Sequence, residues 1–279
     1  MLIPTYNRSR RLFELLKKLE NQTYKNFEVI VIDDGSTDET KLMVENIDVS
    51  YELRYYYKKN EGTSSAQNYG IEKAKGDIIA HTNDDCLPDD DWLENALKYF
   101  NNKNVVGVEG LVYTNFRDKR VYRTISNEEF LKGKKCLLDG FFGANILYKK
   151  DVLKKVGGLD ERFKPFFRED SDLAWRALDH GKIVFAKDVR VFHPAHISKK
   201  SGFQDRYLFR KSCYMNDALL YSKHKKKYLE YHDHSSYDIF FWYYLIKGMK
   251  RFGVYVPIQR LYLKSIAMDI KRLINSFTV

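Results

Sequence analysis

Two hydrophobic periods alternate along the first hundred residues of the chain. A very short apolar segment at 2–3 is the first predicted strand. Longer continuous runs of apolar or β-branched residues, typical of buried strands, lie at 27–32, 53–57 and 78–82. Between these runs, apolar residues recur with helical spacing, which predicts helices at 8–19, 63–75 and 91–100. The alternation predicts an α/β fold with a doubly wound, mostly parallel sheet flanked by helices.

Further signals follow residue 100. Val105–Tyr113 and Gly140–Tyr148 have strand character, and a last strand covers Val189–His196. A helix opens within Phe166–Arg176. Residues 114–138 are irregular and basic, which favours a flexible flap.

Helix-start signals account for several acidic residues. Ser36 with Glu39, and Asp91 with Glu94, have the spacing of capping boxes, in which side chains satisfy free backbone N–H groups at a helix start. Acids in a first helical turn also interact favourably with the helix dipole. The acids at 89–91 are therefore interpreted as part of a helix start and not as ligands.

Two adjacent carboxylates, Asp84 and Asp85, follow the strand predicted at 78–82. A buried strand that delivers two acids to a loop is a way to hold a divalent metal, because hard cations such as Mg²⁺ bind few protein carboxylates and take other ligands from water and substrate phosphates. The structural alternative is an acidic turn, and the pattern alone leaves both interpretations open.

A second acid pair, Glu169 and Asp170, lies in the first turn of the helix predicted over 166–176. One interpretation is that these acids cap the helix dipole. The other is a general base directed into a substrate cleft. His193 is the first of two histidines near the end of the last predicted strand, where it is either a structural residue or a metal ligand near an acid pair.

The composition places the chain among folded proteins and excludes several classes. Hydrophobic residues make up 44% and charged residues 31% of its 279 residues, which is unlike a disordered chain. Cys86, Cys136 and Cys213 show no CxxC spacing, which argues against a zinc ribbon or a disulfide framework and fits a reducing compartment. No GxGxxG or P-loop pattern occurs, so a dinucleotide fold or a P-loop is not supported.

The net charge of +10 is concentrated in the last part of the chain. Residues 200–279 carry 15 Lys and Arg against 6 Asp and Glu, whereas residues 1–199 are nearly neutral. We therefore divide the chain into a domain at 1–200 and a basic, aromatic, helical C-terminal extension at 201–279. The extension suits an anionic membrane surface. A solvated, lysine-rich helical face is the alternative.

The termini and apolar runs bear on location. No apolar signal-peptide core follows Met1, and the longest apolar-aromatic run, Ile239–Ile246, is too short to span a bilayer. We expect a cytoplasmic location, with peripheral contact to the inner face of the membrane through 201–279. No nucleic acid partner is expected.

Short motifs follow one another in an order that resembles the family 2 glycosyltransferases with a GT-A fold. They are Ile3–Arg8 (IPTYNR), Val31–Asp38 (VIDDGSTD), Asn60–Gly62 (NEG), Asn83–Asp85 (NDD), Phe142–Asn145 (FGAN), Gly158–Glu161 (GLDE) and Glu169–Asp170. Each motif is weak alone, but their shared order over residues 1–200 is specific. The resemblance implies a GT-A, Rossmann-like sheet. It also implies inverting, metal-dependent transfer of a sugar from a nucleotide-diphosphate sugar, with a UDP-sugar favoured, to a hydroxyl of a glycan or lipid-linked acceptor.

The resemblance also implies roles for individual residues. The residues that resemble nucleotide contacts are Pro4, Thr5, Tyr6, Asp34, Gly62 and, at the ribose, Asp84. Asp85 resembles the ligand of Mn²⁺ or Mg²⁺, and His193 the late histidine that reaches the metal or the diphosphate. Asp170 resembles the catalytic base, with Glu169 as its helper. The residues that resemble the acceptor-side strand are Gly143, Ala144 and Asn145.

The chain departs from the family pattern at three points. Asn83 replaces the first acid of a complete DxD motif, so metal affinity rests on Asp85. Gln67 precedes Asn68 where the family usually has an arginine, which removes a cation near the diphosphate. The first strand is unusually short.

Two other classes of protein share some of these features. A nucleotidyltransferase has a similar sheet, but it needs a Gly-rich loop with Arg or Lys after the first strand, where this chain has Pro4–Arg8. A non-catalytic, basic membrane- or RNA-binding protein with a decayed site fits the C-terminal extension, whereas the intact acid pairs oppose it.

Overall fold

The computed structural model describes residues 1–113, 143–165, 167–194 and 203–231. The flap predicted at 114–138, His196 and the predicted extension beyond residue 231 lie outside these residues. The chain divides into two compact units, Met1–Ile197 and Ser198–Val279. The sheet belongs to the first unit.

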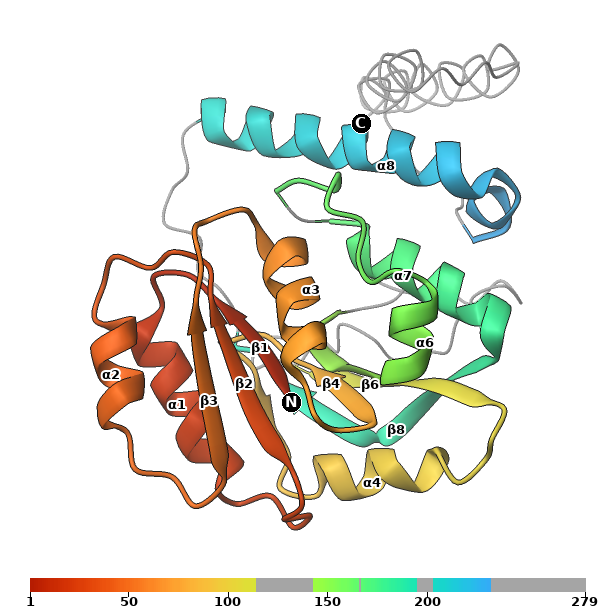
Figure 1. Cartoon of the computed structure of the whole chain (residues 1–279). Coiled ribbons are helices and arrows are strands. Elements are labelled where there is room, and N and C mark those ends of the chain that lie inside the picture. The colour runs from red at the N-terminus through yellow and green to blue at the C-terminus, as the bar shows by residue number, and fades with distance from the viewer. Residues whose placement is uncertain (114–142, 166, 195–202, 232–279) are drawn as a thin grey trace, which may run out of the picture. The chain divides into compact units, whose positions relative to one another are not determined.

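Within the described residues, eight strands form one sheet in the order β3-β2-β1-β4-β7-β6-β8-β5 (Figure 1). Their bounds are β1 Leu2–Thr5, β2 Glu28–Asp33, β3 Glu52–Tyr57, β4 Ile78–His81, β5 Leu87–Pro88, β6 Val105–Tyr113, β7 Ile146–Lys149 and β8 Lys182–Phe192. β1 to β4 are parallel, as the alternation of strands and helices predicts. β7 is antiparallel to β4 and β6, β8 is parallel to β6, and β5 is antiparallel to β8. The predicted mostly parallel sheet is confirmed.

Two predicted strands differ from the observed ones. β8 begins at Lys182, well before the predicted start at Val189, because its first half pairs with β6 despite the exposed Lys187 and Asp188. The small residues Gly143–Asn145 form a 3₁₀ turn, η1, and the strand after it begins at residue 146. Pairing between strands therefore decides boundaries that the apolar pattern alone does not show.

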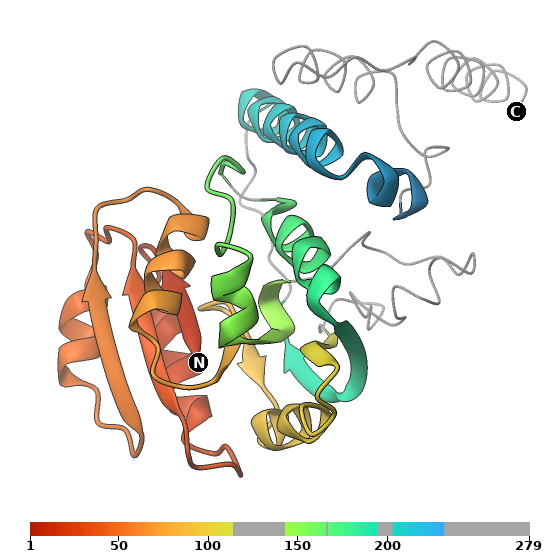
Figure 2. The ribbon, with the colours of Figure 1, turned by 45° about the vertical axis from the view of Figure 1, so that its right-hand side comes forward.

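Helices cover both faces of the sheet (Figures 1 and 2). In the first unit their described bounds are α1 Ser9–Leu19, α2 Thr40–Asn46, α3 Thr63–Lys73, α4 Trp92–Tyr99, α6 Lys150–Lys155, α7 Glu169–Ala177 and the 3₁₀ turn η2 Leu178–His180. The apolar face of α1 is fully buried and consists of Leu12, Leu15, Leu16 and Leu19. It belongs to the same core as Ile3, Val29 and Val31.

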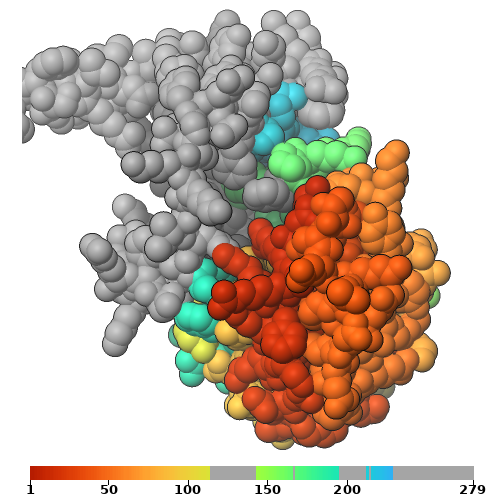
Figure 3. Space-filling view, turned by 90° about the vertical axis from the view of Figure 1, so that its left-hand side faces the viewer, coloured from red at the N-terminus to blue at the C-terminus, as the bar shows by residue number. Residues whose placement is uncertain are grey.

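α3 packs on the opposite face of the sheet. A Cβ at Gly70 would lie 2.0 Å from Leu2 Cδ1 and 3.2 Å from Ile32 Cγ1, so glycine allows the helix to approach β1 and β2 closely. Side chains alternate across a strand, so Leu2 faces α3 and Ile3 faces α1. Figure 3 shows in red and orange the surface formed by the first part of the chain, which includes α1, α2 and β3.

The two predicted capping boxes are wrong. Neither α2 nor α4 has a side-chain hydrogen bond at its N-terminal cap. Ser36 Oγ accepts a hydrogen bond from the Asn7 N–H at 2.8 Å, and Glu94 Oε2 accepts one from the Thr23 hydroxyl at 2.7 Å. Both side chains are used in contacts with distant parts of the chain, which replace the local contacts that the spacing predicts.

The second unit contributes one described helix, α8 (Phe203–Tyr231), with a kink at His224. Within α8, the rings of Tyr221 and Tyr228 meet edge to face with their centroids 5.4 Å apart. In the part of the chain that the structure describes, no helix is long and apolar enough to cross a membrane.

Candidate active site

The predicted site residues meet at one edge of the sheet. The parallel strands β1, β2 and β4 end there, which places Thr5, Asp34 and the loop with Asp84 at this edge. β6 and β8 run in the same direction as β4, so His193, which follows β8, lies at the same edge. β7 runs in the opposite direction, so Gly143, at its start, lies there too. Topology thus joins motifs from both halves of the domain.

Asp84 and Asp85 are held by the segment that links β1 to α1. The Thr5 hydroxyl donates to Asp84 Oδ2 at 2.8 Å. Arg8 Nη1 donates to Asp84 Oδ1 at 2.9 Å and to Asp85 Oδ2 at 2.8 Å, and Arg11 Nη1 lies 3.4 Å from the same Asp85 oxygen. Burial raises the pKa of Asp84, and the charge of Arg8 opposes this rise. The acid pair is therefore neutralised by arginines from α1 and the residue before it.

Asp85 and two side chains next to it offer atoms to a metal ion. Donor atoms of Asp85, Cys86 and His193 lie within 4.8 Å of one another. His193 Nε2 is 3.8 Å from Asp85 Oδ1, and His193 Nδ1 is 3.1 Å from the Pro194 carbonyl oxygen. When Nδ1 carries the proton and donates it to that carbonyl, the Nε2 lone pair faces the carboxylate. Two acceptors that face each other favour a cation between them.

The donor set fits Mn²⁺ or Mg²⁺ held by Asp85 and His193. Carboxylate oxygens bind both ions, and the imidazole favours the transition metal. Burial raises the pKa of the Cys86 thiol well above its ordinary value, so the thiol stays protonated at neutral pH and is a poor ligand. The pairing of Leu87 with Phe192 in the β5–β8 ladder brings the acid loop next to His193.

Asp34 joins the loops that follow β2 and β3. Its Oδ1 accepts from the Lys58 ammonium at 3.1 Å and from the Glu61 N–H at 3.0 Å, and its Oδ2 accepts from the Gly62 N–H at 2.8 Å. Gly62 has a φ of +103°, which glycine adopts without the cost that other residues bear. The predicted nucleotide contacts Asp34 and Gly62 therefore lie in two neighbouring loops that hydrogen bonds hold together.

The first predicted nucleotide loop lies beside Asp34. Pro4 and Thr5 belong to β1, and the Asp34 N–H donates to the Thr5 carbonyl at 2.9 Å. Tyr6 follows the strand and is 48% exposed, unlike the buried Thr5. An exposed aromatic ring at a strand end is a surface on which a nucleotide base can stack.

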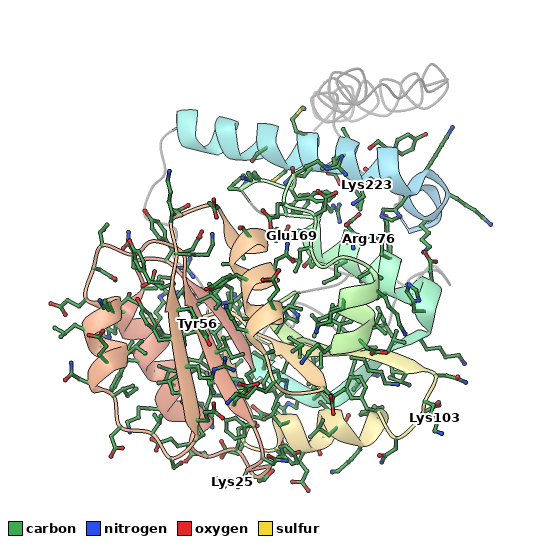
Figure 4. The ribbon with its side chains drawn as sticks, in the orientation of Figure 1. Lys25, Tyr56, Lys103, Glu169, Arg176 and Lys223 are labelled. Carbon is green, nitrogen blue, oxygen red and sulfur yellow. The ribbon has the colours of Figure 1, made fainter. Side chains whose placement is uncertain are left out.

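Glu169 (labelled in Figure 4) and Asp170 begin α7, and the two acids differ in their contacts. Asp170 Oδ2 accepts from the Gly143 N–H at 2.9 Å, and its Oδ1 accepts from the Ser171 N–H at 2.8 Å. Among the described residues, Oε2 of Glu169 is buried without a hydrogen-bond partner. Burial raises the pKa of both acids, and the charge of Asp170 helps to raise that of Glu169 to about 8. Burial therefore makes the pair retain a proton more strongly than exposed carboxylic acids do.

The third acid of this helical turn is structural. Asp172 is fully buried, and its Oδ2 accepts from Arg176 Nε at 2.9 Å and Nη2 at 2.6 Å. Arg176 also donates to the carbonyls of Val156 and Gly158 at 2.6 and 2.7 Å. These bonds hold α7 to the segment after α6.

The Asn145 side chain has a supporting role that the resemblance did not imply. Its Oδ1 accepts from Trp92 Nε1 at 2.8 Å, and its Nδ2 donates at 3.0 Å to the carbonyls of Leu111 and Val189. These hydrogen bonds use the polar atoms of the Asn145 side chain inside the domain. The acceptor contact predicted for Gly143, Ala144 and Asn145 stays a prediction.

Arg8, Arg11 and Cys86 were not predicted as site residues. The sequence does contain a signal for Arg8 and Arg11, which are three residues apart at a predicted helix start and therefore lie on one face of that helix. That helix directly follows the strand that ends in the first predicted nucleotide loop. Cys86 carries no comparable signal, since a lone cysteine after an acid pair is equally typical of a core position.

Comparison with known proteins places the chain in a family. The model of glycosyl transferase family 2 matches residues 1–157, which is more than half of the chain. The chain therefore belongs to glycosyl transferase family 2. Membership of this family argues against the nucleotidyltransferase alternative.

Two relatives and one solved structure illustrate the likeness. An uncharacterised glycosyltransferase of Rickettsia typhi is 30% identical over 207 residues, which cover 70% of this chain and 63% of the relative. The GalNAc(5)-diNAcBac-PP-undecaprenol β-1,3-glucosyltransferase of Campylobacter jejuni is 28% identical over 191 residues, which cover 63% and 57%. The chain thus spans about three fifths of the length of these relatives.

One structural neighbour is the mannosyltransferase PcManGT from Pyrobaculum calidifontis, solved in complex with GDP-Man and Mn²⁺. It is 19% identical with a TM-score of 0.62, and the likeness covers 99% of this chain and 81% of that one. The predicted GT-A fold is confirmed.

Proposed function

We propose that this enzyme catalyses the metal-dependent, inverting transfer of a sugar from a nucleotide-diphosphate sugar to a hydroxyl of a glycan or lipid-linked acceptor. The observation that carries the proposal is the meeting of two acid pairs at one sheet edge, Asp84–Asp85 after β4 and Glu169–Asp170 beside Gly143. One pair has the chemistry to hold a leaving diphosphate through a cation, and the other has the chemistry to accept a proton.

On the donor side, the residues of the chain bind and orient the nucleotide. Tyr6 and the loop around Asp34 contact the base, and Asp84 contacts the ribose. Asp85 and His193 would hold Mn²⁺ or Mg²⁺, which when bound neutralises the negative charge that develops on the leaving diphosphate.

On the acceptor side, Asp170 takes the proton of the attacking hydroxyl. Two backbone N–H groups orient its carboxylate and favour its ionised form. Protonated Glu169 keeps the pair from carrying two adjacent charges. Inversion requires the base and the leaving group to lie on opposite faces of the donor carbon.

A lipid-linked acceptor has two sources of support. The name of the Campylobacter jejuni relative describes a glucosyltransferase that acts on an undecaprenol-diphosphate-linked glycan. The basic extension at 201–279 also suits an anionic membrane surface, at the inner face where such acceptors would be reached. UDP-sugars are the first donors to test, and GDP-sugars follow because PcManGT was solved with GDP-Man.

Thermal unfolding of the full chain with UDP, GDP, CDP and dTDP tests the proposal. A bound ligand raises the melting temperature according to its affinity. We expect one nucleotide to do so with Mn²⁺ and much less in EDTA. Asp85→Asn should lose this shift, whereas Asp90→Asn, which changes an exposed acid paired with Lys18, should keep it. A chain that no nucleotide stabilises, with or without Mn²⁺, contradicts the donor assignment, and equal shifts in EDTA contradict the metal.

A further inference from the structure

The positive charge beside the acid pair comes from the chain itself. A single nitrogen, Arg8 Nη1, bridges Asp84 and Asp85 at 2.9 and 2.8 Å, and Arg11 adds a contact with Asp85 at 3.4 Å. A charged donor that bridges two carboxylates occupies the electrostatic place of a cation. Arg10, between these arginines in sequence, instead pairs with Glu14 on the same helix and is 91% exposed.

The charge balance around Asp84 and Asp85 weakens the attraction of this site for a free divalent ion. The two acids carry two negative charges, and Arg8 and Arg11 carry two positive charges. Asp85 faces the arginines through Oδ2 and His193 through Oδ1, so an added ion would share one carboxylate with two guanidinium groups. The repulsion between these like charges weakens binding of the ion alone. A nucleotide diphosphate that arrives with the ion supplies the missing negative charge.

Arg8 is the partner that is able to leave. Its side chain is 47% exposed, whereas those of Asp84 and Asp85 are 5% and 4% exposed. Arg8 also lines an open groove of about 1110 Å³, together with Asn7 and Asp38. The guanidinium therefore has room to move into the groove without unfolding the domain, while the buried acids stay in place.

We propose that Arg8, assisted by Arg11, is a built-in counter-cation that keeps a free divalent ion off the Asp84–Asp85 pair until a nucleotide diphosphate arrives. Arg8 then turns to the diphosphate, which releases Asp85 to the ion and Asp84 to the ribose. The inference rests on the proposed function, because it takes a metal and a nucleotide diphosphate to bind at this edge.

Mn²⁺ binding by the full chain, read from the EPR signal of the free ion, tests this inference. UDP and GDP are added in separate titrations, which are corrected for Mn²⁺ bound by the nucleotide itself. In the wild type, the nucleotide should tighten Mn²⁺ binding by at least about tenfold, a coupling that is reciprocal. Arg8→Gln removes one opposing charge, so Mn²⁺ alone should bind about tenfold more tightly and the gain from nucleotide should shrink.

Two further variants complete the design. Arg11→Gln should change Mn²⁺ affinity in the same direction but by less, because its contact is longer. Arg10→Gln is the matched control and should bind Mn²⁺ like the wild type. Thermal unfolding without metal checks that each variant folds. If Arg8→Gln does not fold, Arg11→Gln decides the outcome.

The outcomes separate the inference from the proposed function. If folded Arg8→Gln, or Arg11→Gln in its place, binds Mn²⁺ no more tightly than the wild type, the inference is overturned and the proposed function stands. If no variant binds Mn²⁺ with any nucleotide, both are overturned. An equal gain in Arg10→Gln also overturns the inference, because any loss of positive charge would then suffice.

Discussion

Asp170 and Glu169 are adjacent in one helical turn but suit different tasks. The N–H groups of Gly143 and Ser171 hold the Asp170 carboxylate and favour its ionised form. Burial and the neighbouring charge favour the protonated form of Glu169. A general base must be ionised and oriented, which supports the proposal that Asp170 is the base.

Replacing each acid by its amide tests this assignment. Asp170→Asn keeps the size of the side chain and removes its ability to accept a proton, so transfer should fall by ~10²–10⁴-fold. Nucleotide binding, followed by thermal shift, should be nearly unchanged. Glu169→Gln resembles the protonated form and should lose far less activity. An inactive Glu169→Gln beside an active Asp170→Asn would reverse the two roles.

Glu169 should also make the stability of the fold depend on pH. Its pKa rises from 4.5 to about 8 on folding, so between these values the folded chain keeps a proton that the unfolded chain releases. The stabilising contribution is complete below pH 4.5 and is lost as the pH rises toward about 8. Urea unfolding across this window should show the wild type losing stability relative to Glu169→Gln. Parallel pH profiles for the two proteins would contradict the raised pKa.

At the scale of elements, one side chain joins α3 to the loop between α6 and α7. Asn68 Oδ1 accepts from the Leu159 N–H at 2.8 Å, and Asn68 Nδ2 donates to the Leu159 carbonyl and to Glu161 Oε1, both at 2.9 Å. The GLDE motif thus attaches the segment before α7 to α3. This attachment helps to position α7, whose second residue is the proposed base Asp170.

Two neighbouring glycines test this attachment, since both have positive φ. A Cβ at Gly158 (φ +69°) would lie 2.4 Å from Asn68 Oδ1, whereas a Cβ at Gly157 (φ +76°) would meet nothing within 4 Å. Gly157→Ala should cost about 1 kcal/mol for backbone strain. Gly158→Ala should cost about 1–3 kcal/mol more in denaturant unfolding, because it also displaces a hydrogen-bonded amide. In an Asn68→Ala background the two substitutions should cost the same, and a persistent difference would exclude Asn68 as the cause.

At the scale of the whole molecule, chemistry and charge lie in different parts of the chain. The acid pairs belong to the first unit, while most of the net positive charge lies after residue 200. We expect the full chain to sediment with anionic liposomes at low salt and to be released at high salt, because screening weakens this attraction. A chain that ends at residue 197 should stay in the supernatant while keeping its nucleotide response.

Charge substitutions separate a membrane contact from a general effect of positive charge. Replacing Lys225, Lys226 and Lys227 of α8 by Gln should weaken liposome binding by about 1 kcal/mol per residue. The matched control replaces three exposed lysines of the first unit, Lys25, Lys41 and Lys59. Equal losses in both variants would show that the extension has no special part in binding.

The sequence by itself determined the class of fold and the family. It also supplied the candidate site residues other than Arg8, Arg11 and Cys86. Hydrophobic period is a local property, so strands such as β2 and helices such as α1 follow from their own residues. Motif order carries the family because each short motif follows a particular strand or opens a particular helix. Asp84, Asp85, Glu169 and Asp170 were found in this way.

Tertiary structure decided which of these residues meet and what each side chain does. The β5–β8 ladder places His193 beside Asp85. The antiparallel β7 places Gly143 at the same edge of the sheet, where its N–H donates a hydrogen bond to the Asp170 carboxylate. Ser36 and Glu94 bond to distant partners and not to the helix starts that the spacing predicts. Arg8 forms ion pairs with both Asp84 and Asp85. The physical reason is the same throughout: a hydrogen bond or ion pair depends on which groups the folded chain brings within reach, and sequence spacing specifies this only inside one helix or strand.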